Sequence, residues 1–303
     1  MKTKVKKFRF IAKIAQKIAC LTACFAFSAS AAPVAKVGDT EYDTLEAAFA
    51  ALSSENYTLT LQDTAAWPTE TPVHWAAGTQ RGFATTLATA LTAGYKANEG
   101  AITIVCRPGA DVGTMTHGHV EDNLTIYGNN AYLSGGECDL EVDTYRYSRV
   151  TDVQVSEGAF LTQDIAITAY ELDNLGVWGQ RHTSYAVTVT LTDCDGKALE
   201  GTENDQRVYI SGTTGRNDIT LTGCDFLTKN TAVYSNADGT ITATDCTFTG
   251  GAAPFNITTR QMERSPSMSR TVRSRTAAMR ASGSSSPRRF VLSTAARVRS
   301  RPR

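Results

Sequence analysis

The chain has 303 residues and a formal net charge of zero, from 30 Lys and Arg against 30 Asp and Glu. The charges are segregated, because residues 1–32 carry seven basic residues and no acid, residues 33–256 carry 11 basic and 29 acidic residues, and residues 257–303 carry 12 Arg and one acid. This distribution argues against a uniform globular enzyme with a balanced surface. The middle segment is rich in Thr, Gly, Asp, Asn and Val, which favours β structure with many turns.

The first 31 residues have the pattern of an export signal. A basic stretch is followed by the apolar run IACLTACFAF at residues 18–27 and by Ala29-Ser30-Ala31. The pattern predicts a signal peptide over residues 1–31, and its apolar run is too short to span a bilayer. Residues 21–24 also resemble a bacterial lipobox, which would make Cys24 a lipidated first residue. Both interpretations predict an exported protein, secreted or held at a bacterial envelope or surface, with no transmembrane span in the mature chain.

Residues 32–100 predict a small capping region. Gly38-Asp39 is typical of a hairpin turn, and Thr44 is a suitable N-cap for a helix whose apolar residues share one face. Such a region can cover the open end of a stack of strands, which otherwise presents unpaired backbone groups. The expected elements are strands at residues 34–37, 40–42, 58–61 and 101–106, helices at residues 45–52 and 82–93, and a loop at residues 67–80.

Three segments of the chain repeat one pattern. Apolar residues alternate with Thr, an Asp or Gly follows, and a Cys comes next, with spacings of 30 and 22 residues between the cysteines. The alternation predicts a strand with one buried face, and Asp or Gly tolerates the left-handed backbone of a tight corner. Repeats of this length indicate a stacked architecture with apolar positions in columns. The repeats are Val189-Thr-Leu191-Thr-Asp193-Cys194, Ile219-Thr-Leu221-Thr-Gly223-Cys224 and Ile241-Thr-Ala243-Thr-Asp245-Cys246.

Upstream segments fit the same pattern more loosely. We expect corners at Gly128 and Asp164, and variable loops such as residues 171–184 and 201–207 between the repeats. Short strands are expected at residues 207–211 and 232–235. Five cysteines lie beyond the leader, and no CxxC pair occurs among them. The odd count and the missing pair favour a buried ladder of Cys194, Cys224 and Cys246 over disulfides, zinc binding or redox activity.

These repeats resemble the right-handed parallel β-helix proteins of the pectate-lyase-like superfamily. The successive coils of those β-helices often carry an I-x-I-x-N-C-x-F signature. The leader at residues 34–49 is similar to the opening of exported bacterial β-helix proteins. The resemblance implies an all-β fold with a right-handed parallel β-helix over residues 101–256, a hairpin and helix cap before it, and a disordered tail at residues 257–303. The polygalacturonase-like catalytic sets N-T-D, D-D, G-H-G and R-x-K do not occur.

Several polar residues are candidates for chemistry. Asp195 and Asp225, with Asp193 and Asp245 beside the corners, could hold Ca²⁺ or act as an acid/base pair, or could be corner and outward residues only. His117 and His119 could bind a metal or belong to a polar loop. Trp178, Arg181 and His182 could line a glycan groove, or they could belong to an exposed loop.

The function expected from these features is non-catalytic adhesion or glycan binding at the cell surface. The alternative is a polysaccharide lyase or glycoside hydrolase that acts on uronate-type glycans. No nucleotide loop or nucleophile elbow is present, no cofactor is expected apart from the open case of Ca²⁺, and no nucleic acid partner is expected.

The Arg-rich end at residues 257–303 has no apolar period, and it contains 12 Arg but no Lys. Composition predicts disorder there. Because GC-rich codons read out of frame give Arg, Ser, Ala and Pro, we also interpret this segment as the product of a frameshift near residues 254–260.

Overall fold

The computed structural model describes residues 32–115, 118–120, 122–134, 139–141, 147–148, 153–154, 164–180, 186–195, 208–211, 217–228, 232–235, 239–250, 255–257, 289–291 and 296–299. The chain divides into two units, Met1–Pro33 and Val34–Arg303. Only Ala32 and Pro33 of the first unit are among the described residues. The second unit carries every helix and strand that follows.

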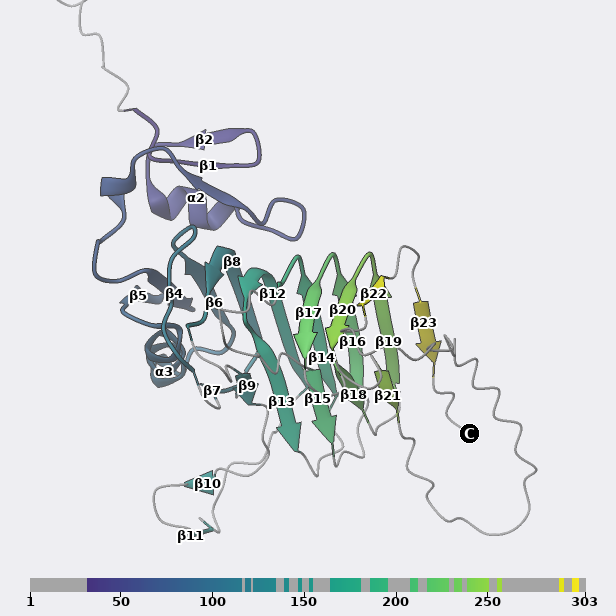
Figure 1. The fold of residues 1–303 in the computed structure, drawn as a ribbon. Helices are drawn as coiled ribbons and strands as arrows, with labels where there is room; N and C mark the ends of the chain where they lie inside the picture. Colours follow the sequence, from purple (N-terminus) through teal and green to yellow (C-terminus); the bar gives the residue numbers. More distant parts are fainter. Residues whose placement is uncertain are drawn as a thin grey trace, which may run out of the picture. The chain divides into compact units, whose positions relative to one another are not determined.

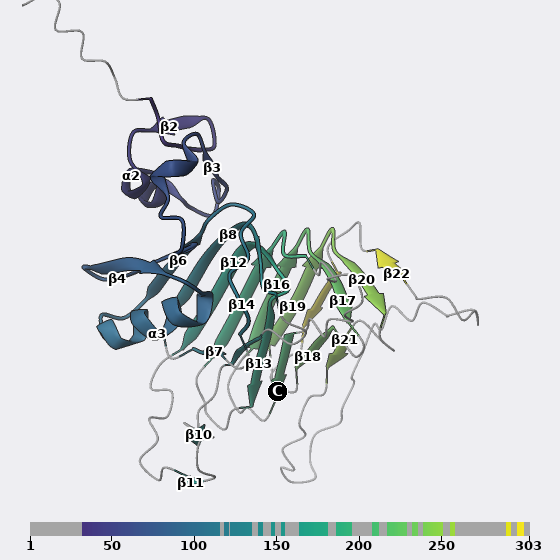
Figure 2. The ribbon, with the colours of Figure 1, turned by 60° about the vertical axis from the view of Figure 1, so that its left-hand side comes forward.

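The protein is all-β in class, and the described residues form two short α-helices and large mixed sheets (Figure 1). The largest sheet has nine strands in the order β23-β19-β16-β14-β12-β8-β6-β4-β5. Six of them run parallel from β6 to β19 and lie side by side in both ribbon views (Figure 2). Those six strands are β6 (Ile102–Cys106), β8 (Leu124–Tyr132), β12 (Ile165–Asp173), β14 (Val187–Thr192), β16 (Asn217–Thr222) and β19 (Gly239–Thr244).

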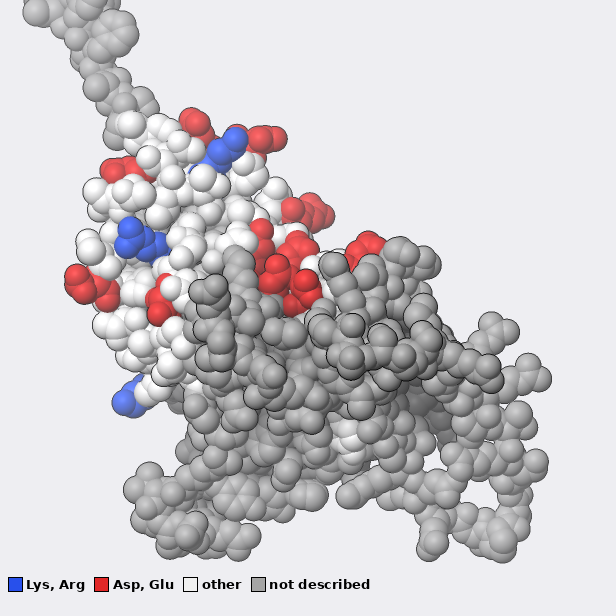
Figure 3. Space-filling view, viewed as in Figure 1, with Lys and Arg blue, Asp and Glu red and all other residues white. Residues whose placement is uncertain are grey.

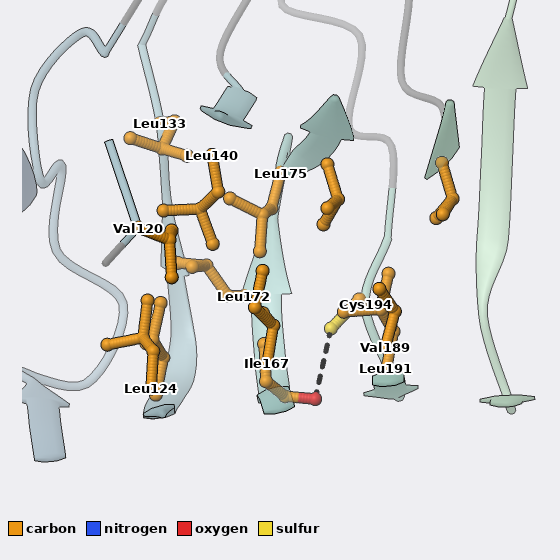
Figure 4. Close-up of a cluster of buried hydrophobic side chains, with 14 of the residues drawn as sticks. Val120, Leu124, Leu133, Leu140, Ile167, Leu172, Leu175, Val189, Leu191 and Cys194 are labelled. Carbon is orange, nitrogen blue, oxygen red and sulfur yellow. Dashed lines mark hydrogen bonds between the residues drawn. The ribbon is translucent and has the colours of Figure 1, made fainter. Parts of the chain in front are cut away.

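The register of the parallel strands aligns equivalent apolar residues in two inward columns. Each column carries one residue from every strand, and all of these side chains are at most 4 % exposed. The close-up in Figure 4 shows Ile167, Val189 and Leu191 beside other buried side chains. The predicted columns are therefore confirmed and extend further upstream. They consist of Ile102, Leu124, Ile167, Val189, Ile219 and Ile241, and of Ile104, Ile126, Ala169, Leu191, Leu221 and Ala243.

Between successive strands of the large sheet the chain visits two smaller sheets. One is a parallel six-stranded sheet in the order β21-β18-β15-β13-β9-β7, and the other has the order β17-β20-β22. The last two passes visit all three sheets, since β16, β17 and β18 pair with β19, β20 and β21 in turn. These strands are β7 (Gly118–His119), β9 (Asp139–Glu141), β13 (Gly176–Gln180), β15 (Val208–Ser211), β17 (Asp225–Thr228), β18 (Val233–Ser235), β20 (Thr247–Gly250) and β21 (Phe255–Ile257). A separate pair is formed by β10 (Tyr147–Ser148) and β11 (Val153–Gln154).

The corners after the large sheet use left-handed backbone, as the repeats predict. Asp193, Gly223 and Asp245 have φ of 50°, 64° and 53°. A Cβ atom at Gly223 would overlap Oδ1 of Asp193, so a larger residue at this corner would displace the Asp193 side chain. The backbone N–H of Asp193 donates to the carbonyl of Thr222 at 2.8 Å, which ties each corner to the next.

The expected corner at Asp164 is wrong. Register pairs Ala169 with Leu191, so Glu171, with φ of 45°, stands where Asp193 stands in the next repeat. Asp164 instead precedes β12, and its Oδ1 accepts from the N–H of Ala186 at 2.8 Å. The expected loop at residues 171–184 also contains the end of β12 and the whole of β13. Both errors arise because Glu is an unusual residue at positive φ, and no Gly, Asn or Asp marks the corner at position 171.

The capping region contains the expected hairpin and first helix. β1 (Ala35–Val37) pairs with β2 (Thr40–Tyr42) and with β3 (Leu59–Leu61). In α2 (Leu45–Ala51), Oγ1 of the N-cap Thr44 accepts from the N–H of Ala47 at 3.2 Å. A short 3₁₀ turn, η1, follows at Thr64–Ala66. Residues 34–67 are called the cap below.

The expected loop at residues 67–80 and helix at residues 82–93 are partly wrong. β4 (Val73–Ala77) and β5 (Gln80–Ala84) form a hairpin around Gly78 and Thr79, and the helix α3 runs later, at Leu87–Ala97. The carboxylate of Glu99 accepts from Thr79 and Gln80 and holds this turn. Leu87, Ala90 and Leu91 of α3 belong to the main core, so the helix packs against the first strands of the large sheet.

Two segments of the Arg-rich end are described as strands. β22 (Arg289–Val291) pairs antiparallel with β20, and β23 (Ala296–Arg299) pairs antiparallel with β19. Both lie in the range that composition assigns to disorder, and the other residues beyond Ile257 lie outside the described part of the chain.

A substitution in an inward column should destabilise the protein strongly. Leu221→Ala removes a side chain that is 0 % exposed, and we expect it to cost about 2–5 kcal/mol of unfolding free energy. Denaturant unfolding followed by circular dichroism measures this cost. Thr220→Ala, on the outward face of the same strand, is the matched control with an expected change of about 0.5 kcal/mol or less. Equal losses in the two variants would contradict the assigned faces.

Candidate binding surface and the cap seam

The structure brings two of the predicted site residues together. Asp195 and Asp225 form a parallel bridge, and the N–H of Asp225 donates to Oδ1 of Asp195 at 3.2 Å. Trp178 lies in β13, paired with Tyr209 of β15, but its side chain is outside the described part. Arg181 and His182, like Cys24 and His117, also lie outside the described residues, and of His119 only the backbone is described.

The three repeat cysteines are buried, and none is in a disulfide. The thiol of Cys194 donates to the carbonyl of Ala169 at 3.6 Å (Figure 4), and that of Cys224 donates to the carbonyl of Leu191 at 3.4 Å. The hydrogen bond between the Cys224 and Cys194 thiols raises the pKa of Cys224, the one with Cys246 opposes the rise, and burial adds to it, while burial alone raises the pKa of Cys106 to about 12. Neutral buried thiols are inert, so these cysteines fill the core.

Acidic residues recur at the corners and two positions beyond them. Successive repeats place carboxylates at Glu171 and Asp173, at Asp193 and Asp195, at Asp225, and at Asp245. Figure 3 shows acidic side chains gathered near the centre of the view and the described basic side chains apart from them. Within the described ranges no group of three or more His, Cys, Asp or Glu is arranged to hold a metal ion. Two of the residues expected for Ca²⁺, Asp195 and Asp225, are thus neighbours.

Threonines line the outward face of the large sheet. Register aligns six of them, one from each parallel strand, in a single row, and all six are partly exposed. Neighbours in the row are about 4.8 Å apart, the spacing between paired strands. The row consists of Thr103, Thr125, Thr168, Thr190, Thr220 and Thr242. We call it the threonine row.

The next outward row changes character along the sheet. It holds Val105, Tyr127 and Tyr170 in the first three strands, and then threonine in β14, β16 and β19. The cap packs on the aromatic part, since Val105, Tyr127 and Tyr170 join Leu59 and Trp67 in a second apolar cluster. We call this contact between the cap and the large sheet the cap seam. The break in the Thr pattern at Tyr127 and Tyr170 was the sequence signal for it.

Stacked tyrosines and hydrogen bonds hold the cap seam. Tyr57 of the cap stacks on Tyr170 at 4.8 Å between ring centroids, and Tyr170 stacks on Tyr127 at 5.4 Å. The hydroxyl of Tyr57 donates to Oδ2 of Asp193 at 2.6 Å, which raises the pKa of Tyr57 to about 12. Elsewhere the N–H of Leu59 donates to Oδ1 of the buried Asn129 at 2.7 Å.

Glu171 is a titratable residue that sequence reasoning missed. Its Oε1 accepts from the Thr58 hydroxyl at 2.8 Å, while its Oε2 is buried without a hydrogen-bond partner. Burial raises the pKa of this carboxyl, the Thr58 hydrogen bond opposes the rise, and the charges of Asp193 and Asp173 add to it. A carboxyl with a raised pKa beside a second carboxylate can serve as a proton donor.

No family model matches the chain, and no curated protein or solved structure matches it. In the part of the chain that the structure describes, no helix is long and apolar enough to cross a membrane.

Glu171→Gln should stabilise the protein at neutral pH by about 1 kcal/mol, because it removes a charge whose oxygen is buried without a partner. The folded-state pKa is raised, so the wild-type carboxyl is neutral at low pH and the charge costs nothing there. The gain should therefore be largest above the raised pKa and vanish as the pH falls below 4.5. Thermal unfolding between pH 4 and 8 measures it.

The matched control is Asp245→Asn, at a solvent-exposed corner whose φ of 53° asparagine also tolerates. This variant should change stability little at any pH. A loss of stability in Glu171→Gln at pH 7 would show that the charge of Glu171 supports the fold.

Proposed function

We propose that this protein is an exported, non-catalytic binding protein of a bacterial surface or envelope, built as a right-handed parallel β-helix. Its ligand is a glycan or another repeating polymer bound along the threonine row. The single observation that carries the proposal is the in-register alignment of six partly exposed threonines on six parallel strands.

The β-helix is supported by the repeated passes through the three sheets and by the two continuous inward columns. The export is supported by the basic and apolar leader of the sequence.

A row of threonines suits a repeating hydroxylated ligand for two reasons. Each side chain offers a methyl group and a hydroxyl that donates and accepts hydrogen bonds. Because β-branched side chains have restricted χ1 angles, the row loses little side-chain entropy when it is covered. A ligand with a matching repeat can make the same small contact many times, and many weak contacts add to useful affinity.

The acidic corners beside this face favour neutral or amino-bearing glycans over uronates. Glu171, Asp193 and Asp245 place negative charge along the edge of the outward face, and a polyanion would be repelled there. Of the basic residues that the structure describes, Lys36, Arg81, Lys96 and Arg107 belong to earlier parts of the chain, whereas Arg297 of β23 pairs with Thr242 at the end of the threonine row. The alternative of a lyase acting on uronates is weakened by the same acidic corners, because they would repel its substrate.

A glycoside hydrolase remains the second candidate, and a specific observation favours it. Glu171, with its raised pKa, lies next to the carboxylate of Asp193 in a part-buried seam. Two carboxyl groups in unlike environments are the usual pair for hydrolysis of a glycosidic bond. Release of reducing ends from a polysaccharide by the purified protein, lost in Glu171→Gln, would establish this function and overturn the non-catalytic one.

The binding proposal is tested on a glycan array and by co-sedimentation with insoluble polysaccharides. The double variant Thr190→Lys/Thr220→Lys places long side chains across the row, and we expect at least a tenfold loss of binding. Thr190→Val/Thr220→Val keeps the shape and removes two hydroxyls, and should weaken binding by a smaller factor.

The matched control is Thr247→Lys, which alters a partly exposed threonine of β20 in another sheet. It should bind as the wild type does. Equal losses in the control and in the double Lys variant would contradict the assigned face, and so would full binding by the double Lys variant.

A further inference from the structure

His74 is a buried titratable residue at the centre of the cap seam that no function described above uses. It lies in β4, where register places it opposite Phe83 of β5 and Val105 of β6. Its side chain is 7 % exposed, and its Nδ1 atom is buried without a hydrogen-bond partner. A histidine in such a place is stable only while it is neutral, because a buried imidazolium needs acceptors for both N–H groups.

The surroundings of His74 are aromatic, and they come from both sides of the seam. The ring of Phe49 in α2 lies 4.5 Å from the imidazole between centroids, and that of Phe83 lies 5.1 Å away. Phe49 also contacts Trp67 at 5.2 Å. The cap therefore covers His74 with Phe49 and keeps most of the imidazole from water.

Two charged side chains act on His74 from the elements packed against it. Glu46, in the first turn of α2, favours the protonated form, while Arg81 of β5 opposes it. Desolvation is the largest effect and lowers the pKa of His74 to about 4 from an ordinary 6.5. When the cap is open the imidazole is solvated and regains its ordinary pKa.

We propose that His74 is an acid-sensitive latch that releases the cap, residues 34–67, from the large sheet while the rest of the sheet stays folded. The released surface includes Val105, Tyr127 and Tyr170, which directly continue the outward row of Thr192, Thr222 and Thr244. Acid thus uncovers an aromatic extension of the outward face. The latch does not depend on what the threonine row binds.

The direction in which pH shifts the opening of the cap follows from proton binding by His74. The open state binds a proton between pH 6.5 and about 4, whereas the closed state does not, so lower pH favours opening. Within that window the equilibrium constant for opening should rise about tenfold for each unit by which the pH falls, which is the slope for binding of one proton. Above pH 6.5 the slope should vanish, because His74 is then neutral in both states.

The experiment is hydrogen exchange on the full chain from pH 4 to 8, read by mass spectrometry as protection factors corrected for the intrinsic pH dependence of exchange. Peptides from β1, α2 and β3 report the cap, and peptides from β12, β14 and β16 report the sheet. We expect protection of the cap to fall about tenfold for each pH unit below 6.5 while the sheet stays protected.

His74→Phe keeps an aromatic ring and removes the proton site, so its cap protection should lose this slope. Phe49→Leu weakens the same contact but leaves the histidine, so it should lower cap protection at every pH and keep the slope. An unchanged slope in His74→Phe overturns the proposal, as does simultaneous loss of protection in cap and sheet.

A second measurement uses the wild-type protein alone, so it does not depend on whether a variant folds. The imidazole C–H signals of the wild-type protein can be titrated by nuclear magnetic resonance, with His74 assigned by its contacts to Phe49 and Phe83. Titration near pH 4, together with cap-specific exchange, supports the latch. Titration near pH 6.5 overturns it.

Discussion

The parallel register between neighbouring strands of the large sheet is the constraint on which the rest of the structure depends. Because Leu124 pairs with Ile167 and Ile167 with Val189, one choice of register puts both apolar columns inward and the threonines outward. A slip by one residue would reverse both faces at once, so burial of the inward columns specifies the outward row as strictly as the core. The threonine row and the cap seam are consequences of that single alignment.

The corners preserve this alignment from one strand to the next. A left-handed residue at Asp193, Gly223 or Asp245 turns the chain without using a long loop, and the corner N–H groups donate to the following repeat. The thiols of Cys194 and Cys224 fill the first inward position past the corner and donate to carbonyls of the preceding strand. The corner therefore satisfies backbone groups that a buried bend would otherwise leave unpaired.

Short-range patterns in the sequence were sufficient to predict the repeats, the columns and the first elements of the cap. Thr44 is a good N-cap, and Gly38 favours a turn, because each effect depends on a few neighbouring residues. The β4–β5 hairpin was missed, since Pro72 and Gly78 signal a loop and the hairpin is held by the distant carboxylate of Glu99.

The candidate site was predicted less well than the fold. Asp195 and Asp225 were correctly expected to be neighbours, because they follow matching corners. Tyr57, His74 and Glu171 acquire their properties from contacts across more than 20 residues of sequence, and no local pattern reports such contacts.

The equivalence of β14, β16 and β19 has a further consequence for how such a chain can change over generations. Each of these strands meets its two neighbours through nearly the same inward and outward side chains. Recombination between repeats could therefore duplicate or delete a whole unit without creating a mismatched contact. The cap packs on β6, β8 and β12 and reaches the corner after β14 through Tyr57 and Asp193, so such events beyond β14 would vary the length of the threonine row and leave the cap seam unchanged.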